Sequence, residues 1–148
     1  MGQEDGGEQK PILDPVIFRA RRKMEALGKN PDFGQALINA ESAEEVTQSA
    51  IDLGIPGDGE QIIGIAYRAF AQEDVSFGAA VEANLLQSIQ GLEIPTELPA
   101  WFLANATSLP GYQLRKGWGD RINKETRQEF IAIALSVMLK AVQERLRE

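Results

Sequence analysis

Helix-start and helix-stop signals recur along this sequence, and they constrain its fold more than any other feature. Asp14-Pro15 and Asn30-Pro31 each place a capping side chain before a proline, which favours the first turn of a helix. Ser42-Ala43-Glu44-Glu45 has the form of a capping box, and Gly28 is a typical left-handed helix stop. Between the signals, apolar residues recur at helical spacing, and no segment shows the period of two that strands require. We therefore predict an all-α fold.

The same signals divide the chain into six or seven helices in an irregular bundle. Five of the predicted helices cover about 15–27, 31–39, 43–53, 60–72 and 124–147. A further helix is capped by Asp74 or Ser76 and ends at Gly91. A short helix or turn then lies before Pro110. Three segments are interpreted as connections because each is rich in glycine, in proline, or in a mixture of polar and aromatic residues: 54–59, 92–99 and 111–123.

The last predicted helix has the strongest apolar pattern. One stripe contains Phe130, Ile131, Ala134, Leu135, Met138, Val142 and Leu146, and Ile133, Val137 and Leu139 extend it most of the way round. We expect this long apolar C-terminal helix to lie at the centre of the fold or in contact with a partner.

Length and composition favour one domain inside the cell. A chain of 148 residues can bury a core of its own, so residues 11–148 are expected to form a single helical domain. Residues 1–10 are rich in Gly and Glu and are expected to be a disordered acidic tail, unlike the basic and apolar start of a signal peptide. No apolar run reaches the roughly 18 residues that span a bilayer. We expect a cytoplasmic protein without a membrane span.

The sequence contains no histidine and no cysteine. These are the commonest general base, the commonest metal ligands and the best protein nucleophile. The remaining carboxylates, lysines, arginines and hydroxyls match no catalytic motif. We therefore expect a protein that is not an enzyme and that needs no metal or cofactor.

The net charge of −7 argues against a nucleic-acid partner, since phosphate binding needs clustered cations. No lysine or arginine lies between Arg68 and Arg115. The two small basic clusters, 19–23 and 115–127, are interpreted as solvated helix faces and ends.

A local pattern of residues resembles a known module. In sequence order it contains Phe18, Leu27, Asn30-Pro31-Asp32, Leu37, Ala40, Ser42, Glu44-Glu45, Ala50 and Gly54-Ile55. Residues 18–55 are thereby similar to the Nif11-like helical module, which occurs as a leader in ribosomally made peptide precursors and in some cyanobacterial proteins. About 90 further residues follow in place of a short core peptide. The resemblance implies a helical recognition module rather than a precursor.

Residues 94–103 are the first candidate site. Ile94, Leu98, Trp101, Phe102 and Leu103 lie around two prolines in a stretch without cations. Large apolar and aromatic residues on a rigid segment are typical of binding hot spots. The alternative is a helix that packs its aromatic residues into the core.

Residues 115–121 are the second candidate site. Trp118 lies between glycines, with Arg115 and Arg121 nearby, so it could stack on a ligand while an arginine contacts a phosphate or carboxylate. The alternative is that Trp118 anchors the loop to the bundle.

The sequence therefore favours a non-enzymatic helical adaptor or accessory subunit that binds another protein, or itself, through an apolar and aromatic surface. The alternative function is a small-ligand-binding regulatory domain with a pocket near 115–121.

Overall fold

The computed structural model describes residues 14–55, 59–71, 74–106, 111–118 and 121–147. Within these ranges the chain forms eight α-helices and no strand, which confirms the all-α prediction. The helices are α1 (Pro15–Ala26), α2 (Pro31–Asn39), α3 (Ala43–Asp52), α4 (Gly59–Ala71), α5 (Val75–Ser88), α6 (Leu98–Ala106), α7 (Gly111–Trp118) and α8 (Lys124–Leu146). The interpretation of 111–123 as a connection is wrong over its first part, because α7 lies there. The predicted acidic tail lies outside the described residues.

Side-chain caps begin the helices where the sequence signals predict them. Asp14 accepts a hydrogen bond from the Val16 N–H at 3.0 Å, and Asn30 accepts one from the Asp32 N–H at 2.9 Å. Helix α5 is capped by Asp74 rather than by Ser76. Gly28 has a φ of 72°, as its predicted role as a left-handed stop requires. These local contacts explain why the helix starts can be found from sequence alone.

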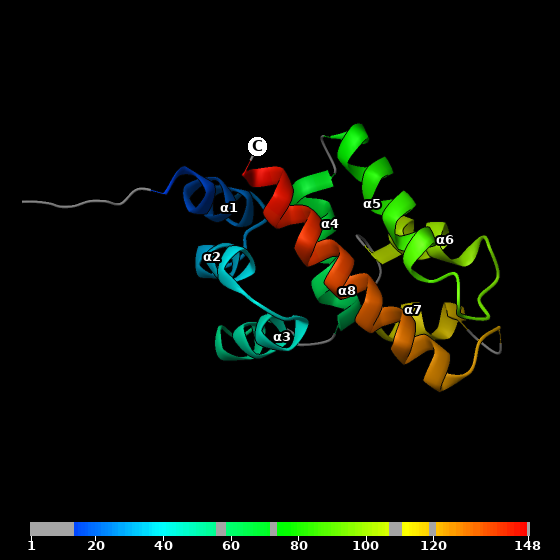
Figure 1. The fold of residues 1–148 in the computed structure, drawn as a ribbon. Coiled ribbons are helices and arrows are strands. Elements are labelled where there is room, and N and C mark those ends of the chain that lie inside the picture. The colour runs from blue at the N-terminus through cyan, green and yellow to red at the C-terminus, as the bar shows by residue number, and fades with distance from the viewer. Residues whose placement is uncertain (1–13, 56–58, 72–73, 107–110, 119–120, 148) are drawn as a thin grey trace, which may run out of the picture.

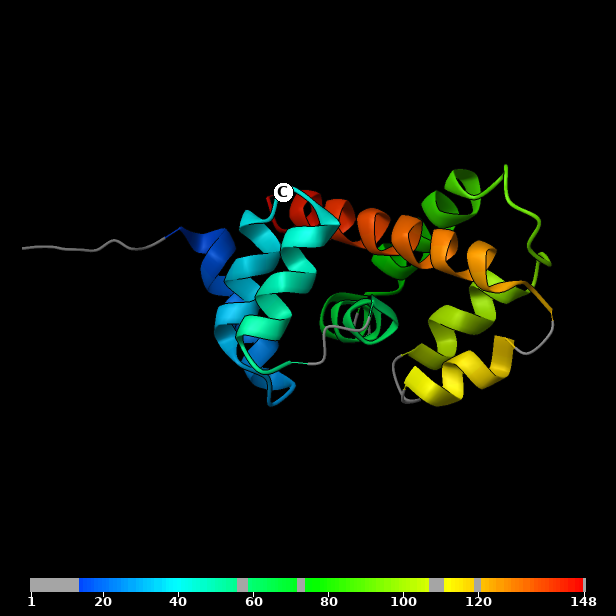
Figure 2. The same cartoon turned by 90° about the horizontal axis from the view of Figure 1, so that it is seen from below.

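The helices form two groups that α8 joins (Figure 1). Helices α1, α2 and α3 pack together at one side, and α5, α6 and α7 lie at the other. Helix α4 lies between the groups, beneath α8, and Figure 2 shows it end-on below the long axis of α8. None of the described helices combines the length and the apolar character needed to cross a membrane.

Helix α8 is central but it is not apolar all round. Its 23 residues bury Phe130, Ala134, Leu135, Met138, Leu139, Val142 and Leu146. The other apolar positions of the predicted stripe, Ile131, Ile133 and Val137, are partly buried and pack against the same core. Polar residues such as Ser136, Lys140 and Glu144 occupy exposed positions. The apolar surface of α8 is therefore used within this chain.

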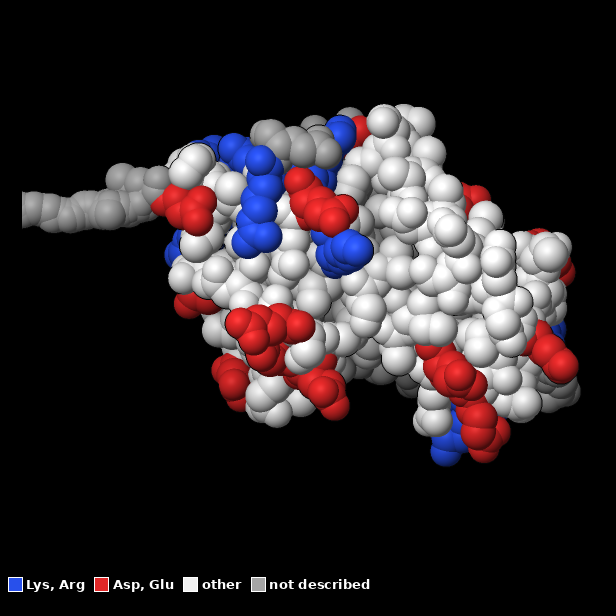
Figure 3. All heavy atoms as spheres, viewed as in Figure 1, with Lys and Arg blue, Asp and Glu red and all other residues white. Residues whose placement is uncertain are grey.

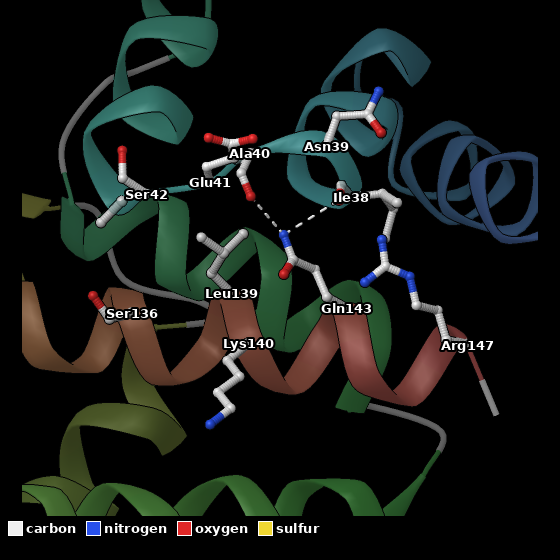
Figure 4. Close-up of a pocket in the computed structure, with 11 residues that line it drawn as sticks. Ile38, Asn39, Ala40, Glu41, Ser42, Ser136, Leu139, Lys140, Gln143 and Arg147 are labelled. Carbon is white, nitrogen blue, oxygen red and sulfur yellow. Dashed lines mark hydrogen bonds between the residues drawn. The ribbon is translucent and has the colours of Figure 1, made fainter.

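The first group of helices and α8 are held together by caps that each supplies to the other. Arg19 of α1 donates to the Leu146 carbonyl at the end of α8. Gln143 of α8 donates to the carbonyl of Leu37 at 3.0 Å. It also donates to those of Ala40 at 2.8 Å and Ile38 at 3.3 Å (Figure 4). Carbonyls at a helix end lack partners inside the helix, so α1 satisfies the end of α8 and α8 satisfies the end of α2.

Candidate interaction surface

The structure places most of the first candidate site, residues 94–103, in the core and not on the surface where a partner could bind. Leu98, Phe102 and Leu103 belong to the core, with at most 2% of their surface exposed. The ring of Phe102 meets that of Phe130 edge to face, with centroids 5.4 Å apart. Ile94 and Trp101 are only partly buried, but both pack against the core. The structure therefore agrees with the alternative interpretation, in which this segment forms a helix that packs its aromatic residues into the core.

Trp101 is positioned by α7. A Cβ atom added to Gly117 would lie 2.2 Å from Cη2 of the Trp101 indole, so the ring rests directly on the α7 backbone. The Asn105 side chain donates to the Trp101 carbonyl at 2.8 Å within α6. Trp101 thus joins α6 to α7, and its environment is that of a packing residue.

The residues of the second candidate site are placed as follows. Arg115 and Trp118 lie on α7, and their side chains are outside what the structure describes. Arg121 is exposed and its guanidinium pairs with the Glu97 carboxylate. This ion pair joins the segment before α8 to the one before α6, which gives Arg121 a structural contact that the sequence did not reveal.

A different surface, the outward face of α5, has the exposure that the 94–103 segment lacks. Phe77, Val81 and Leu85 turn inward and are buried. On the opposite side Val75 is 86% exposed and Leu86 is 41% exposed. The remaining outward positions are small or uncharged and exposed: Ser76, Ala79, Ala80, Ala83 and Gln87. We call these seven residues the α5 face.

The α5 face is large and uncharged. The space-filling view shows a continuous uncharged surface over α5 and the adjoining part of α8, at upper right in Figure 3. Charged residues gather instead over α1 to α3 and towards both ends of α8. Within α5 the only charged residue is Glu82, which is partly buried at the edge of the face. Exposed apolar patches commonly mark protein-binding sites, and Val75, Leu86 and the alanines supply the apolar part of this face.

A hollow runs between α5 and α8 beside this face. Its volume is about 290 Å³, and Asn84, Gln87 and Ser88 line it from α5. Val137, Lys140, Ala141 and Glu144 line it from α8. Lys140 and Glu144 carry opposite charges one helical turn apart, so this wall adds no net charge.

Two larger cavities lie on the other side of α8. One, of about 600 Å³, lies between the end of α2, the start of α3 and α8, and Gln143 spans it to reach the α2 carbonyls (Figure 4). The other, of about 540 Å³, lies between α3, the start of α4 and α8, with Ile131 and Leu135 on its apolar wall and Arg127 among its polar residues. This volume lies within the range of small-molecule sites. Among the described residues no group of three acidic side chains is arranged to hold a metal ion.

Asp74 begins α5 and fixes it to α8. Its carboxylate accepts from the Phe77 N–H at 3.0 Å and pairs with Arg145. The backbone hydrogen bond from Phe77, followed by the Arg145 contact, lowers the pKa of Asp74 below its ordinary value. The guanidinium of Arg145 also lies over the Phe77 ring, 5.9 Å from its centroid. These contacts hold α5 in register on α8 and so orient the α5 face.

Sequence reasoning missed the α5 face although a signal was present. Helical spacing identifies Phe77, Val81, Leu85, Leu86 and Ile89 as apolar, but only Leu86 of these is exposed. The informative feature is the composition of the opposite side. A surface helix normally places charged residues there, and α5 places alanines, a serine and a glutamine.

The chain matches no protein-family model, and comparisons with curated proteins and with solved structures gave no match either.

Proposed function

We propose that this chain is a non-enzymatic helical adaptor or accessory domain that binds another protein through the α5 face. The observation that carries the proposal is an exposed helix face with no charged residue on it. Val75 and Leu86 leave apolar surface in water at its two ends, and three alanines lie between them. Covering such a surface releases ordered water without the cost of stripping charges of solvent.

The composition supports binding over catalysis. The absence of histidine and cysteine leaves few groups suited to acid–base or nucleophilic work near neutral pH. The compact unit α1 to α3 spans most of the region that resembles a Nif11-like recognition module. A role in recognition is consistent with both features.

The proposal is tested with one surface variant and a matched control. Ala83→Arg places a long cation at the centre of the α5 face, whereas Ala26→Arg adds the same charge at an exposed position of α1. Both residues are exposed in helices, so both variants should keep the melting temperature of the parent within a few degrees. We expect a stoichiometric partner to be captured from the native host by the parent and by Ala26→Arg, and to be lost with Ala83→Arg.

Equal capture by Ala83→Arg would contradict the proposal. A monomer that captures nothing would also contradict it, and the cavity between α3, α4 and α8 would then be the place to look for a small ligand.

A further inference from the structure

We propose that the α5 face receives an amphipathic helix of the partner, with small and apolar residues on its contact side and lysines or arginines along its flanks. This inference rests on the proposed function and names the kind of element that would be bound. It is argued from the shape of the face, from the charges around it and from the poorer fit of a second copy of this chain.

The shape of the face suits a helix. Ala79, Ala80 and Ala83 lie at the middle of α5 and have no side chain beyond Cβ, so another backbone can approach closely there. Val75 and Leu86 project at the two ends and would contact side chains further along the partner helix. Helix α5 has 14 residues and is about 21 Å long, which a partner helix of similar length can follow. A bound strand is disfavoured because the backbone groups of α5 are engaged within the helix.

The charge around the face favours a basic partner. Residues 69–114 contain five carboxylates, at 73, 74, 82, 93 and 97, and no lysine or arginine. Asp74 and Glu97 pair with Arg145 and Arg121. Glu82 at the edge of α5 and Glu93 beyond its end have no ion-pair partner among the described residues. Cations on the flank of a docked helix that lies beside Glu82 would meet this carboxylate at the rim of an uncharged contact.

Glu82 already acts electrostatically on its surroundings. Burial raises the pKa of the Tyr67 hydroxyl on α4, and the negative charge of Glu82 raises it further. Tyr67 also lies beside α5, since a Cβ added to Gly78 would be 3.0 Å from its hydroxyl oxygen. The negative charge of Glu82 therefore acts on Tyr67 at the contact between α4 and α5, on the flank of the α5 face.

A second copy of this chain fits the face less well. Two copies would bring identical carboxylates to both rims, and each would contribute a net charge of −7. Like charges brought together across an interface oppose binding, whereas opposite charges accelerate association and select the partner. The same apolar face therefore favours a basic helix over self-association.

The test uses the full-length protein and synthetic helical peptides of 18 residues labelled with fluorescein. One peptide has a Leu/Ala stripe flanked by lysines, a second replaces the lysines by glutamates, and a third has the composition of the first in scrambled order. Anisotropy titrations give the affinities, and amide chemical shifts locate the bound peptide. Sedimentation at up to 100 µM protein measures self-association.

We expect the lysine-flanked peptide to bind at least tenfold more tightly than the glutamate-flanked and scrambled peptides, with the largest shift changes on α5. Ala83→Arg should weaken this binding at least tenfold, and Ala26→Arg, which has the same net charge, should change it less than twofold. Glu82→Gln should weaken it severalfold and reduce its salt dependence.

Three results would overturn the inference. The glutamate-flanked or scrambled peptide could bind as well as the lysine-flanked one, the shift changes could lie away from α5, or a dimer sensitive to Ala83→Arg could form in the absence of peptide. If the host partner is still lost with Ala83→Arg while the lysine-flanked peptide does not bind, the adaptor function stands and only the basic helix is excluded.

Discussion

At the scale of single residues, Asp74 shows how one side chain can serve local and tertiary structure together. It caps α5 through the Phe77 N–H and, through its other oxygen, pairs with Arg145 near the end of α8. Both contacts are stronger when the carboxylate is ionised, and for that reason both lower the pKa of Asp74. The folded state therefore favours the ionised form of Asp74 more than the unfolded chain does.

This linkage predicts how the stability of the protein depends on pH. Folding lowers the pKa of Asp74, so this residue stabilises the folded state fully at pH values above the unfolded pKa of about 4. The stabilisation is lost as the pH falls through the folded pKa. Asp74→Asn keeps a capping oxygen but removes the charge. We expect the variant to be less stable than the parent at pH 7 in urea unfolding, and the difference to shrink steadily below about pH 4.

Arg145→Gln provides the comparison for this experiment. It removes the ion pair but leaves the Phe77 N–H, which is the larger cause of the lowered pKa. The acid dependence should therefore be only partly reduced. A stability difference between Asp74→Asn and the parent that is constant from pH 7 to pH 3 would refute the assignment.

At the scale of the elements, residues that are close in sequence determine where a helix starts, but they do not determine which of its faces is buried. Asn30, Ser42 and Asn123 cap the helices that begin one residue later, so each signal and its effect lie within one turn. Helix α7 was missed because Gly111 and Gly117 disfavour a helix. The structure shows that Gly117 is needed where the Trp101 ring contacts α7, which is a contact between elements and has no local signal.

Helix α6 explains why the first candidate site was misplaced. Its sequence, LPAWFLANA, has large apolar residues on more than one side, so no apolar stripe marks the buried face. Only the packing of Phe102 on Phe130 and of α6 on α4 decides which residues are inside. For α5 the same ambiguity hid the exposed face, since the inward residues and the alanines both favour burial.

The contact between α4 and α6 gives a prediction at this scale. A Cβ added to Gly64 would lie 2.0 Å from the Ala106 carbonyl oxygen, so Gly64→Ala must push the two helices apart. We expect this variant to lose about 1–3 kcal/mol of the free energy of unfolding, as overpacked cores do. Gly91→Ala is the control, because its added Cβ would meet no atom within 4 Å. Urea unfolding of both variants measures the difference, and equal stabilities would show that α4 and α6 can separate without cost.

At the scale of the whole molecule, α8 unites the fold. It contacts α1, α2 and α3 on one side and α4 and α5 on the other. Six of its large apolar side chains are buried: Phe130, Leu135, Met138, Leu139, Val142 and Leu146. Together they contribute about 9–18 kcal/mol of hydrophobic stabilisation at the usual value for each buried side chain, which is comparable to the net stability of a typical domain.

Removal of α8 should therefore unfold the remaining helices. We expect a chain of residues 1–123 to lose most of its helical circular dichroism and its cooperative melting transition. A chain of residues 14–148 keeps every described helix and should melt like the parent. A cooperative transition in the shorter chain would show that α1 to α7 form a core without α8.

The reciprocal caps between the first and last helices also bear on how this protein is made. A ribosome synthesises α1 and α2 first, yet the carbonyls of Leu37 and Ala40 receive their bonds from Gln143, about a hundred residues later. The hydrogen bond from Arg19 likewise forms only after Leu146 has been synthesised. The native contacts of α1 and α2 thus remain incomplete until α8 has been synthesised, and the apolar surface that α8 covers stays uncovered until then. The fold can therefore be completed only after α8 has been synthesised, so the α5 face acquires its fixed orientation later than the formation of α5 itself.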